Sequence, residues 1–207
     1  VLSLMGIPEL QGHLQTSAGN EMSQCLSVAM GSIEMSLSNN RMVAETMARG
    51  VEAVQRQAVK GEQTASDWDA AAYQEILTSF VGSNPETFGG GIWFEPYQYR
   101  PEQRYFSPYC MRQNGAVTYV DNYSLGEGVY YTDQDWYTNA ANTTQKSVWS
   151  APYYDEFAQI SMVTSSAPIY DETGRLLGVA TADIDLTQMQ QMVLSLDVVA
   201  NGRAFSD

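Results

Sequence analysis

The N-terminal part of the chain constrains the fold most strongly. From about Leu10 to about Val59 the sequence has no proline, and apolar residues recur mostly every three or four positions, the spacing of one helical face. A helix of about fifty residues is on the order of 75 Å long, more than a compact domain of this size needs. The pattern predicts one long helix or two in series. The expected break is Ser38-Asn39-Asn40, with Gly50 as a weaker one, because short polar side chains and glycine disfavour helix interiors.

The remainder of the chain reads as one further helix followed by a sheet. Ser66 and Asp69 have the spacing of a capping box, which predicts a helix from about Asp67 to Val81. Alternating and β-branched residues predict strands at 92–95, 105–111, 116–119, 147–149, 160–170 and 176–184, a helical patch at 136–140 and a helix at 186–196. Gln113-Asn114-Gly115 carries the Asn-Gly signal of a hairpin. The expected fold class is α+β, with a long N-terminal helix and an antiparallel sheet.

Charge and segment composition exclude several classes of protein. The chain has 24 acidic and 10 basic residues among 207, a net charge of −14, whereas a nucleic-acid partner demands clustered Lys and Arg. The same field attracts cationic solutes. No stretch approaches the roughly 20 apolar residues of a membrane span. Both ends of the sequence are abrupt, so we expect a fragment of a longer protein.

The residues needed for catalysis or metal binding do not occur in recognisable patterns. His13 is the one histidine, and no Gly-x-Ser-x-Gly elbow accompanies it. Cysteine and histidine together number three, too few for a metal set with known spacing. Gly89-Gly90-Gly91 precedes a strand instead of opening a helix, unlike a phosphate-binding loop. We therefore expect no enzyme activity, no catalytic residues, no metal and no cofactor.

A run of aromatic residues and isolated acids, from Tyr130 to Asp183, points to a binding pocket. Large rings with a few carboxylates suit a small cation, because a ligand site needs a few convergent polar groups within apolar walls. Asp183 lies in the apolar run Leu177-Gly178-Val179-Ala180-Thr181-Ala182, where an unpaired carboxylate would cost several kcal/mol or take up a proton. It therefore needs a backbone turn, a partner such as Arg175, or a ligand.

The order of these motifs resembles the double Cache sensor domain of bacterial and archaeal transmembrane receptors. The resemblance rests on a long N-terminal helix, Asp135-Trp136-Tyr137, Trp149-Ser150-Ala151-Pro152-Tyr153-Tyr154-Asp155, a Pro-Ile-Tyr-Asp hairpin at 168–171 and Gly178 to Ile184. It implies a stalk and dimerisation helix at residues 1–65 and a membrane-distal, PAS-like ligand-binding module at 66–186. A connecting helix and the start of a mostly missing membrane-proximal module follow at 187–207, where 201–205 resemble a first strand.

The resemblance also implies site residues. Members that bind amino acids share a motif that is matched here by Trp136, Tyr137, Tyr153, Asp155 and Asp183. Its first tyrosine falls next to Tyr130 and Tyr131, its arginine is replaced by Gln134, and Trp149 completes the expected ligand-binding set. A neutral amide cannot hold a ligand carboxylate as the arginine fork does, whereas acids and rings suit an ammonium group. The expected ligand is therefore an amine, with an amino acid second and a purine or carboxylate third.

The expected function is an extracytoplasmic, ligand-binding sensor domain of a membrane-anchored receptor. The output module would be a chemotaxis module, a histidine kinase or a diguanylate cyclase, and the domain would be a homodimer through its N-terminal helix. Two alternatives remain. A ligand-independent dimerisation module is favoured if protein groups satisfy Asp155 and Asp183, and a secreted hydrolase needs a nucleophile, a base and oxyanion donors around one cleft.

Overall fold

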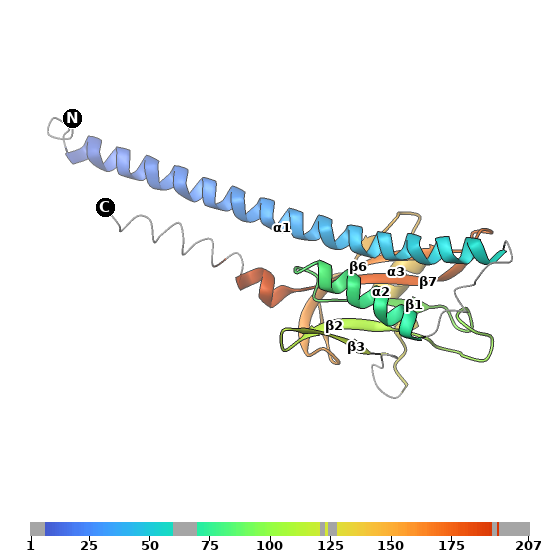
Figure 1. Cartoon of the computed structure of the whole chain (residues 1–207). Helices are drawn as coiled ribbons and strands as arrows, with labels where there is room; N and C mark the ends of the chain where they lie inside the picture. The colour runs from blue at the N-terminus through green and yellow to red at the C-terminus, as the bar shows by residue number, and fades with distance from the viewer. Residues whose placement is uncertain (1–6, 60–69, 121–122, 124–127, 192–193, 195–207) are drawn as a thin grey trace. The chain divides into compact units, whose positions relative to one another are not determined.

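The computed structural model describes residues 7–59, 70–120, 123, 128–191 and 194. The predicted capping box at Ser66 and the predicted strand at 201–205 lie outside these ranges. Figure 1 shows a long N-terminal helix and an antiparallel sheet, which confirms the α+β class. The elements are α1 (Ile7–Val59), α2 (Ala70–Ser83), β1 (Gly89–Phe94), β2 (Tyr109–Gln113), β3 (Ala116–Val120), η3 (Tyr131–Asp133), α3 (Asp135–Ala141), β4 (Val148–Trp149), β5 (Tyr153–Asp155), β6 (Ile160–Tyr170) and β7 (Leu176–Asp185).

Helix α1 is continuous over 53 residues, so the break predicted at Ser38-Asn39-Asn40 and the weaker one at Gly50 do not occur. The two asparagines bond outside the helix. Asn40 Oδ1 accepts a 2.6 Å hydrogen bond from Thr87 Oγ1, and Asn39 Nδ2 donates to Glu86 Oε2 at 3.4 Å. Because their amides bond to the segment before β1, these side chains do not compete for the backbone of α1.

The chain divides into two compact units, residues 1–36 with 188–207, and residues 37–187. In the first unit α1 exposes Met22, Leu26 and Met30 by 61%, 56% and 60%, and their spacing of four places them along one side of the helix. In the second unit the remainder of α1 buries residues such as Val43 and Met47 with α2 and the sheet. The C-terminal part of α1 therefore belongs to the core around the sheet.

The sheet is antiparallel throughout its described strands. Its order is β3-β2-β1-β7-β6-β4, and β5 also pairs with β6. Asn114 and Gly115 have φ values of 52° and 81°, the left-handed pair of a type I′ turn, so the predicted Asn-Gly hairpin is confirmed. A second hairpin joins β6 to β7, and its register shifts between Ile169 and Tyr170.

Strand β2 begins at Tyr109, four residues later than predicted. Pro108 has no backbone N–H and therefore interrupts a regular ladder. The carbonyl oxygens of Phe106 and Pro108 still accept hydrogen bonds of 3.1 Å from the backbone of Phe94 and Ile92. Residues 106–108 thus run beside β1 without forming a regular strand.

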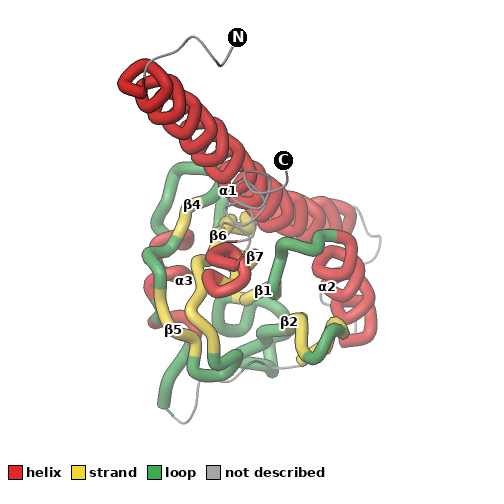
Figure 2. Tube along the Cα trace, turned by 90° about the vertical axis from the view of Figure 1, so that its left-hand side faces the viewer, coloured by secondary structure: helices red, strands yellow, loops and turns green. Residues whose placement is uncertain are grey.

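The two faces of the sheet carry different cores. Ile92 and Phe94 of β1 belong to a cluster with α1 and α2, whereas Trp93 belongs to a mainly aromatic cluster with α3 on the opposite face. This division follows from the alternation of side chains along a strand. Figure 2 shows α2 and α3 on opposite sides of the strands. The aromatic face carries the candidate site.

Arg112 of β2 holds the C-terminal end of α2. Its guanidinium donates hydrogen bonds to the carbonyl oxygens of Val81 at 2.5 Å, Asn84 at 3.0 Å and Thr87 at 3.0 Å. The last carbonyls of a helix lack partners within the helix, and a cation is favourable at that end. Arg112 therefore joins α2 and the turn after it to the sheet.

Candidate ligand-binding site

Two glycines of β1 leave room for a tyrosine to cross the strand. Gly89 is paired with Asp183 of β7, and Gly91 with Tyr109 of β2. A Cβ added at Gly89 would overlap the Tyr109 hydroxyl, and one added at Gly91 would lie 3.0 Å from the Tyr109 ring. The phenol of Tyr109 therefore passes over β1 and reaches a carboxylate two strands away.

Asp183 is the acid at the end of this path, and it is 3% exposed. Its Oδ2 accepts a 2.7 Å hydrogen bond from the Tyr109 hydroxyl, and its Oδ1 accepts one of 2.8 Å from the Thr164 hydroxyl. Burial raises the pKa of Asp183 to about 7, the two hydroxyl donors oppose that rise, and the negative charge of Asp155 adds to it. Asp183 thus has neutral hydrogen-bond donors and an acidic neighbour.

The Thr164 hydroxyl also lies 2.8 Å from the Tyr153 hydroxyl. A threonine hydroxyl has one proton to donate, and here it is directed at Asp183. Tyr153 therefore donates to Thr164, and the chain of hydrogen bonds runs from Tyr153 through Thr164 to Asp183. The pKa of Tyr153 is raised, first by burial and next by the charge of Asp183, so this phenol stays neutral.

Asp155 at the end of β5 is the second acid, and it is 6% exposed. The Tyr123 hydroxyl donates to it and lies 2.6 Å from Oδ1 and 2.5 Å from Oδ2. The backbone N–H of Ala158 donates to Oδ1 at 2.7 Å, within the turn that joins β5 to β6. Burial, followed by the charge of Asp155, raises the pKa of Tyr123, so its phenol also remains a neutral donor.

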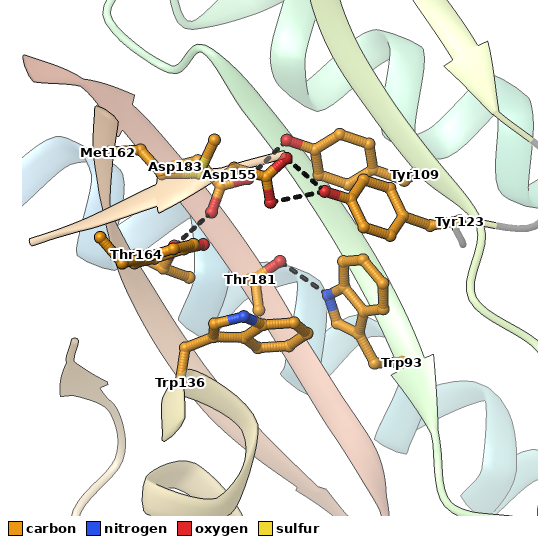
Figure 3. Close-up of a pocket in the computed structure, with 10 residues that line it drawn as sticks. Trp93, Tyr109, Tyr123, Trp136, Asp155, Met162, Thr164, Thr181 and Asp183 are labelled. Atoms are coloured by element: carbon orange, nitrogen blue, oxygen red, sulfur yellow. Dashed lines mark hydrogen bonds between the residues drawn. The ribbon is translucent and has the colours of Figure 1, made fainter. Parts of the chain in front are cut away.

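Trp93 packs against three of the other aromatic rings in the lining, and Figure 3 shows it beside Trp136 and below Tyr109 and Tyr123. Its ring centroid is 4.8 Å from that of Trp136, 5.1 Å from that of Tyr123 and 5.7 Å from that of Tyr109. Its Nε1–H donates a 2.8 Å hydrogen bond to Thr181 Oγ1, which satisfies the polar atom of the indole. The indole rings of Trp93 and Trp136 thus form part of the wall.

These side chains surround a cavity with a free volume of about 10 Å³, which is the room that one water molecule needs. The lining contains two carboxylates and no arginine, lysine or histidine. An organic ligand therefore requires side chains to move before it can enter. The lining residues are Trp93, Tyr109, Tyr123, Trp136, Tyr153, Asp155, Met162, Thr164, Thr181 and Asp183.

Four of the residues proposed from the sequence line this cavity, namely Trp136, Tyr153, Asp155 and Asp183. The structure places the other five elsewhere. Tyr131 donates to the Phe94 carbonyl at 2.6 Å, and Tyr137 donates to Glu95 Oε1 at 2.7 Å. Both phenols therefore bond to the end of β1 and the residue after it.

The three other residues are also absent from the lining of the cavity. Tyr130 is 40% exposed and stacks on Tyr105 at a centroid distance of 5.1 Å. Gln134 precedes α3, and its Nε2 donates to the Tyr130 carbonyl at 3.3 Å. Trp149 lies in β4 and pairs with Ser165 of β6. Gln134 therefore does not contribute to the lining of the cavity.

Sequence reasoning missed Trp93, Tyr109, Tyr123, Met162, Thr164 and Thr181 as lining residues. One signal was available, because Thr181 lies two positions before Asp183 and therefore on the same face of the strand. The others come from different strands or from a loop, and their convergence depends on strand order and register.

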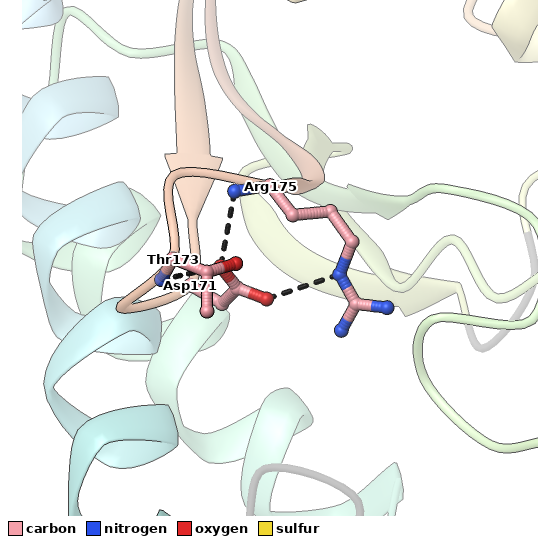
Figure 4. Close-up of polar contacts among 3 residues, drawn as sticks. All are labelled: Asp171, Thr173 and Arg175. Atoms are coloured by element: carbon pink, nitrogen blue, oxygen red, sulfur yellow. Dashed lines mark hydrogen bonds and ion pairs between the residues drawn. The ribbon is translucent and has the colours of Figure 1, made fainter.

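Arg175 is not the partner of Asp183. It lies in the β6–β7 hairpin, where its Nε donates to Asp171 Oδ2 at 3.0 Å (Figure 4). Asp171 Oδ1 also accepts hydrogen bonds from the Thr173 backbone and hydroxyl and from the Arg175 backbone. These bonds, that of the Thr173 hydroxyl first, lower the pKa of Asp171 to about 2. The arginine thus supports the turn.

The polar groups that line the cavity are carboxylates, hydroxyls and indole N–H groups. In that part of the chain, no group of three or more His, Cys, Asp or Glu side chains is placed to bind a metal ion. No helix among the same residues has both the length and the apolar character needed to cross a membrane. The chemistry of the cavity is therefore that of buried carboxylates, hydroxyls and aromatic faces.

Comparisons with known proteins agree with this fold. The family model described as "Methyl-accepting chemotaxis protein-like, first PDC sensor domain" matches residues 73–191. The chain is 38% identical over 74 residues to methyl-accepting chemotaxis protein McpC of Bacillus subtilis (strain 168), a match that covers 36% of this chain and 11% of McpC. The chain therefore spans about a tenth of this curated relative.

Two solved structures show the same fold at low sequence identity. Methyl-accepting chemotaxis protein X matches with a TM-score of 0.67 and 18% identity, over 89% of this chain and 68% of that one. The ligand-binding domain of the Campylobacter jejuni chemoreceptor Tlp3, in complex with L-valine, matches with a TM-score of 0.63 and 17% identity, over 91% and 68%. The likeness to Cache-type sensors inferred from the sequence is confirmed by the family match, which covers more than half of the chain. The chain belongs to the family of methyl-accepting chemotaxis protein-like first PDC sensor domains.

Proposed function

We propose that this chain is the extracytoplasmic ligand-binding domain of a membrane-anchored receptor and that it binds a small organic cation in the cavity around Asp155 and Asp183. The observation that carries the proposal is the composition of the lining, which holds two buried acids and several aromatic rings but no cationic side chain. A cationic ligand would supply the missing positive charge.

Exchange of neutral donors for the N–H groups of a protonated amine would strengthen the hydrogen bonds to the acids, whereas a quaternary ammonium would contribute its charge alone. Tyr109, Tyr123 and Thr164 now satisfy the two carboxylates. Hydrogen bonds between ionised partners are about twice as strong as neutral ones, and a cation over an indole contributes about 0.5–2 kcal/mol more. The indole faces of Trp93 and Trp136 would provide this contact.

An amino acid is the second choice, because its carboxylate would need a donor that the cavity does not show. Gln134, at the position of the family's arginine, bonds to the Tyr130 carbonyl instead of lining the cavity. Tlp3 was solved with L-valine, so an amino acid remains the alternative ligand class. A purine or carboxylate ligand ranks third, because neither brings a positive charge to the two buried acids and a carboxylate would be repelled by them.

One observation favours a different function, a ligand-independent dimerisation module. Both acids already have hydrogen-bond partners within the protein, and the cavity has a free volume of only about 10 Å³. Dimerisation through α1 would suit the exposed row of Met22, Leu26 and Met30. We propose a homodimer through this helix in either case, with a chemotaxis module, a histidine kinase or a diguanylate cyclase as the output half of the receptor.

A thermal-shift screen tests the proposal. The purified domain is heated with choline, putrescine and phenethylamine, with alanine and 4-aminobutyrate, and with succinate, since a ligand at 100 times its Kd stabilises by about 2.7 kcal/mol. We expect shifts with amines that Asp155→Asn and Asp183→Asn abolish. The matched control is Asp133→Asn, because Asp133 is exposed and lies outside the cavity lining. A folded domain that responds to none of these compounds would favour the dimerisation module.

A further inference from the structure

Asp183 has titratable neighbours on several elements but no cationic one in the cavity. It faces Tyr109 from β2, Tyr153 and Asp155 from β5, and Tyr123 from the segment after β3. The other residues around it do not titrate; they are Gly89 and Trp93 of β1, Met162 and Thr164 of β6, Thr181 of β7 and Trp136 of α3. Asp155 is therefore the one charged group near Asp183 among the lining residues, and its charge has the same sign.

This environment favours a protonated Asp183 when the cavity is empty. A carboxylate removed from water without a counter-cation takes up a proton more readily, and burial accordingly raises the pKa of Asp183 to about 7. The hydroxyls of Tyr109 and Thr164 supply hydrogen bonds but no charge. A cation in the cavity would reverse this preference, because an opposite charge close to a carboxylate favours its ionised form.

We propose that Asp183 carries a proton in the empty site and releases it to solvent when an organic cation enters, so that the domain reports cation concentration relative to acidity. The inference rests on the proposed function, because it needs a cationic ligand. The exchange balances simply: the carboxyl O–H bond breaks, one proton leaves, and one ligand charge takes its place. Asp155 either keeps the hydrogen bond that Tyr123 donates or accepts one from the ligand in its place.

The expected consequence is a pH-dependent affinity. Where a proton and a cation compete for one carboxylate, the apparent Kd rises about tenfold for each pH unit below the pKa of the empty site. Between pH 8.5 and pH 5.5 the apparent affinity should fall by about thirtyfold. Close to one proton should be released per bound cation at pH 6, and almost none at pH 8.5.

Isothermal titration calorimetry with choline tests the exchange, because the charge of a quaternary ammonium does not titrate. Titrations in two buffers with different ionisation enthalpies, at several values between pH 5.5 and 8.5, give both affinity and protons released. Asp183→Asn, checked for cooperative unfolding, should give no binding heat at any pH, so the protons released are counted on the wild type, and Asp133→Asn and His13→Gln should keep the wild-type profile. The His13 variant removes the one histidine of the chain.

The outcomes separate the two proposals. Choline binding with a flat pH profile and no proton release overturns the exchange and leaves the proposed function standing. Putrescine and phenethylamine serve as further probes, because both stay charged across this pH range. If none of the three cations binds at any pH, the proposed function and the exchange fail together. The wild-type proton count decides the matter even if Asp183→Asn does not fold.

Discussion

Replacing Asp183 by asparagine should remove a pH dependence from the stability of the empty domain. In the folded protein burial raises the pKa of Asp183 to about 7, whereas the pKa of an aspartate in an unfolded chain is about 3.9. Between these values the folded state binds a proton that the unfolded state has lost. The free energy of unfolding therefore falls as the pH rises, and the contribution of Asp183 is lost once the pH exceeds its folded-state pKa.

The size of the effect follows from the same two pKa values. One proton of difference corresponds to about 1.4 kcal/mol per pH unit. From pH 5 to 8.5 the wild-type domain should lose about 3 kcal/mol through Asp183, or about 6–12 °C in Tm for a chain of this length. Asp183→Asn carries no charge to bury, so it should resemble the wild type at pH 5 and exceed it by about 3 kcal/mol at pH 8.5.

Urea unfolding followed by tryptophan fluorescence measures the difference at each pH. Subtracting the variant from the wild type cancels groups that titrate alike in both proteins. Asp133→Asn and His13→Gln serve as controls, and both should keep the wild-type slope. Parallel curves for the wild type and Asp183→Asn from pH 5 to 8.5 would refute the reasoning, because Asp183 would then titrate alike in the folded and unfolded states.

Three further substitutions test other parts of the structure. Gly89→Ala should lower the free energy of unfolding by about 1–3 kcal/mol in urea unfolding, because the new Cβ overlaps the phenol that crosses β1. The matched control is Gly82→Ala in α2, which has open space around it and should be neutral or stabilise by up to about 1 kcal/mol. Arg112→Ala should lower the free energy of unfolding by about 2–4 kcal/mol, because three carbonyls lose a charged donor. If Arg112→Lys kept the full wild-type stability, the guanidinium would not be required. Tyr123→Phe leaves Asp155 with a backbone donor and should tighten phenethylamine binding by up to about tenfold, because the protonated amine no longer has to displace the phenol. An unchanged calorimetric affinity would show that the phenol is not displaced.

Local sequence patterns predicted most of the elements, for identifiable reasons. The period of α1, the Asn114-Gly115 turn and the long β-branched strands are each encoded by residues close together in the chain. The errors occurred where a distant contact decides the outcome. Asn40 does not break α1, because Thr87, 47 positions later, takes its side-chain oxygen.

The site shows the same division between local and distant information. The alternation of a strand and the cost of burying an acid identified Asp183, and the order of motifs identified Asp155, Tyr153 and Trp136. Tyr109, the hydrogen-bond partner of Asp183, could not be identified in this way, because its phenol reaches Asp183 only across the glycines of the intervening strand β1.

Register also depends on tertiary structure. Counting back from the pair Tyr170 and Leu176 would place Val163 opposite Asp183, but the shift between Ile169 and Tyr170 places Thr164 there instead. A shift of one residue reverses which side chains face the cavity. The sequence by itself determined the elements and the acids, because periodicity and burial cost are local properties. Only the tertiary structure decided which hydroxyls and rings surround those acids, because strand order, a register shift and the absence of a Cβ at Gly89 bring them together.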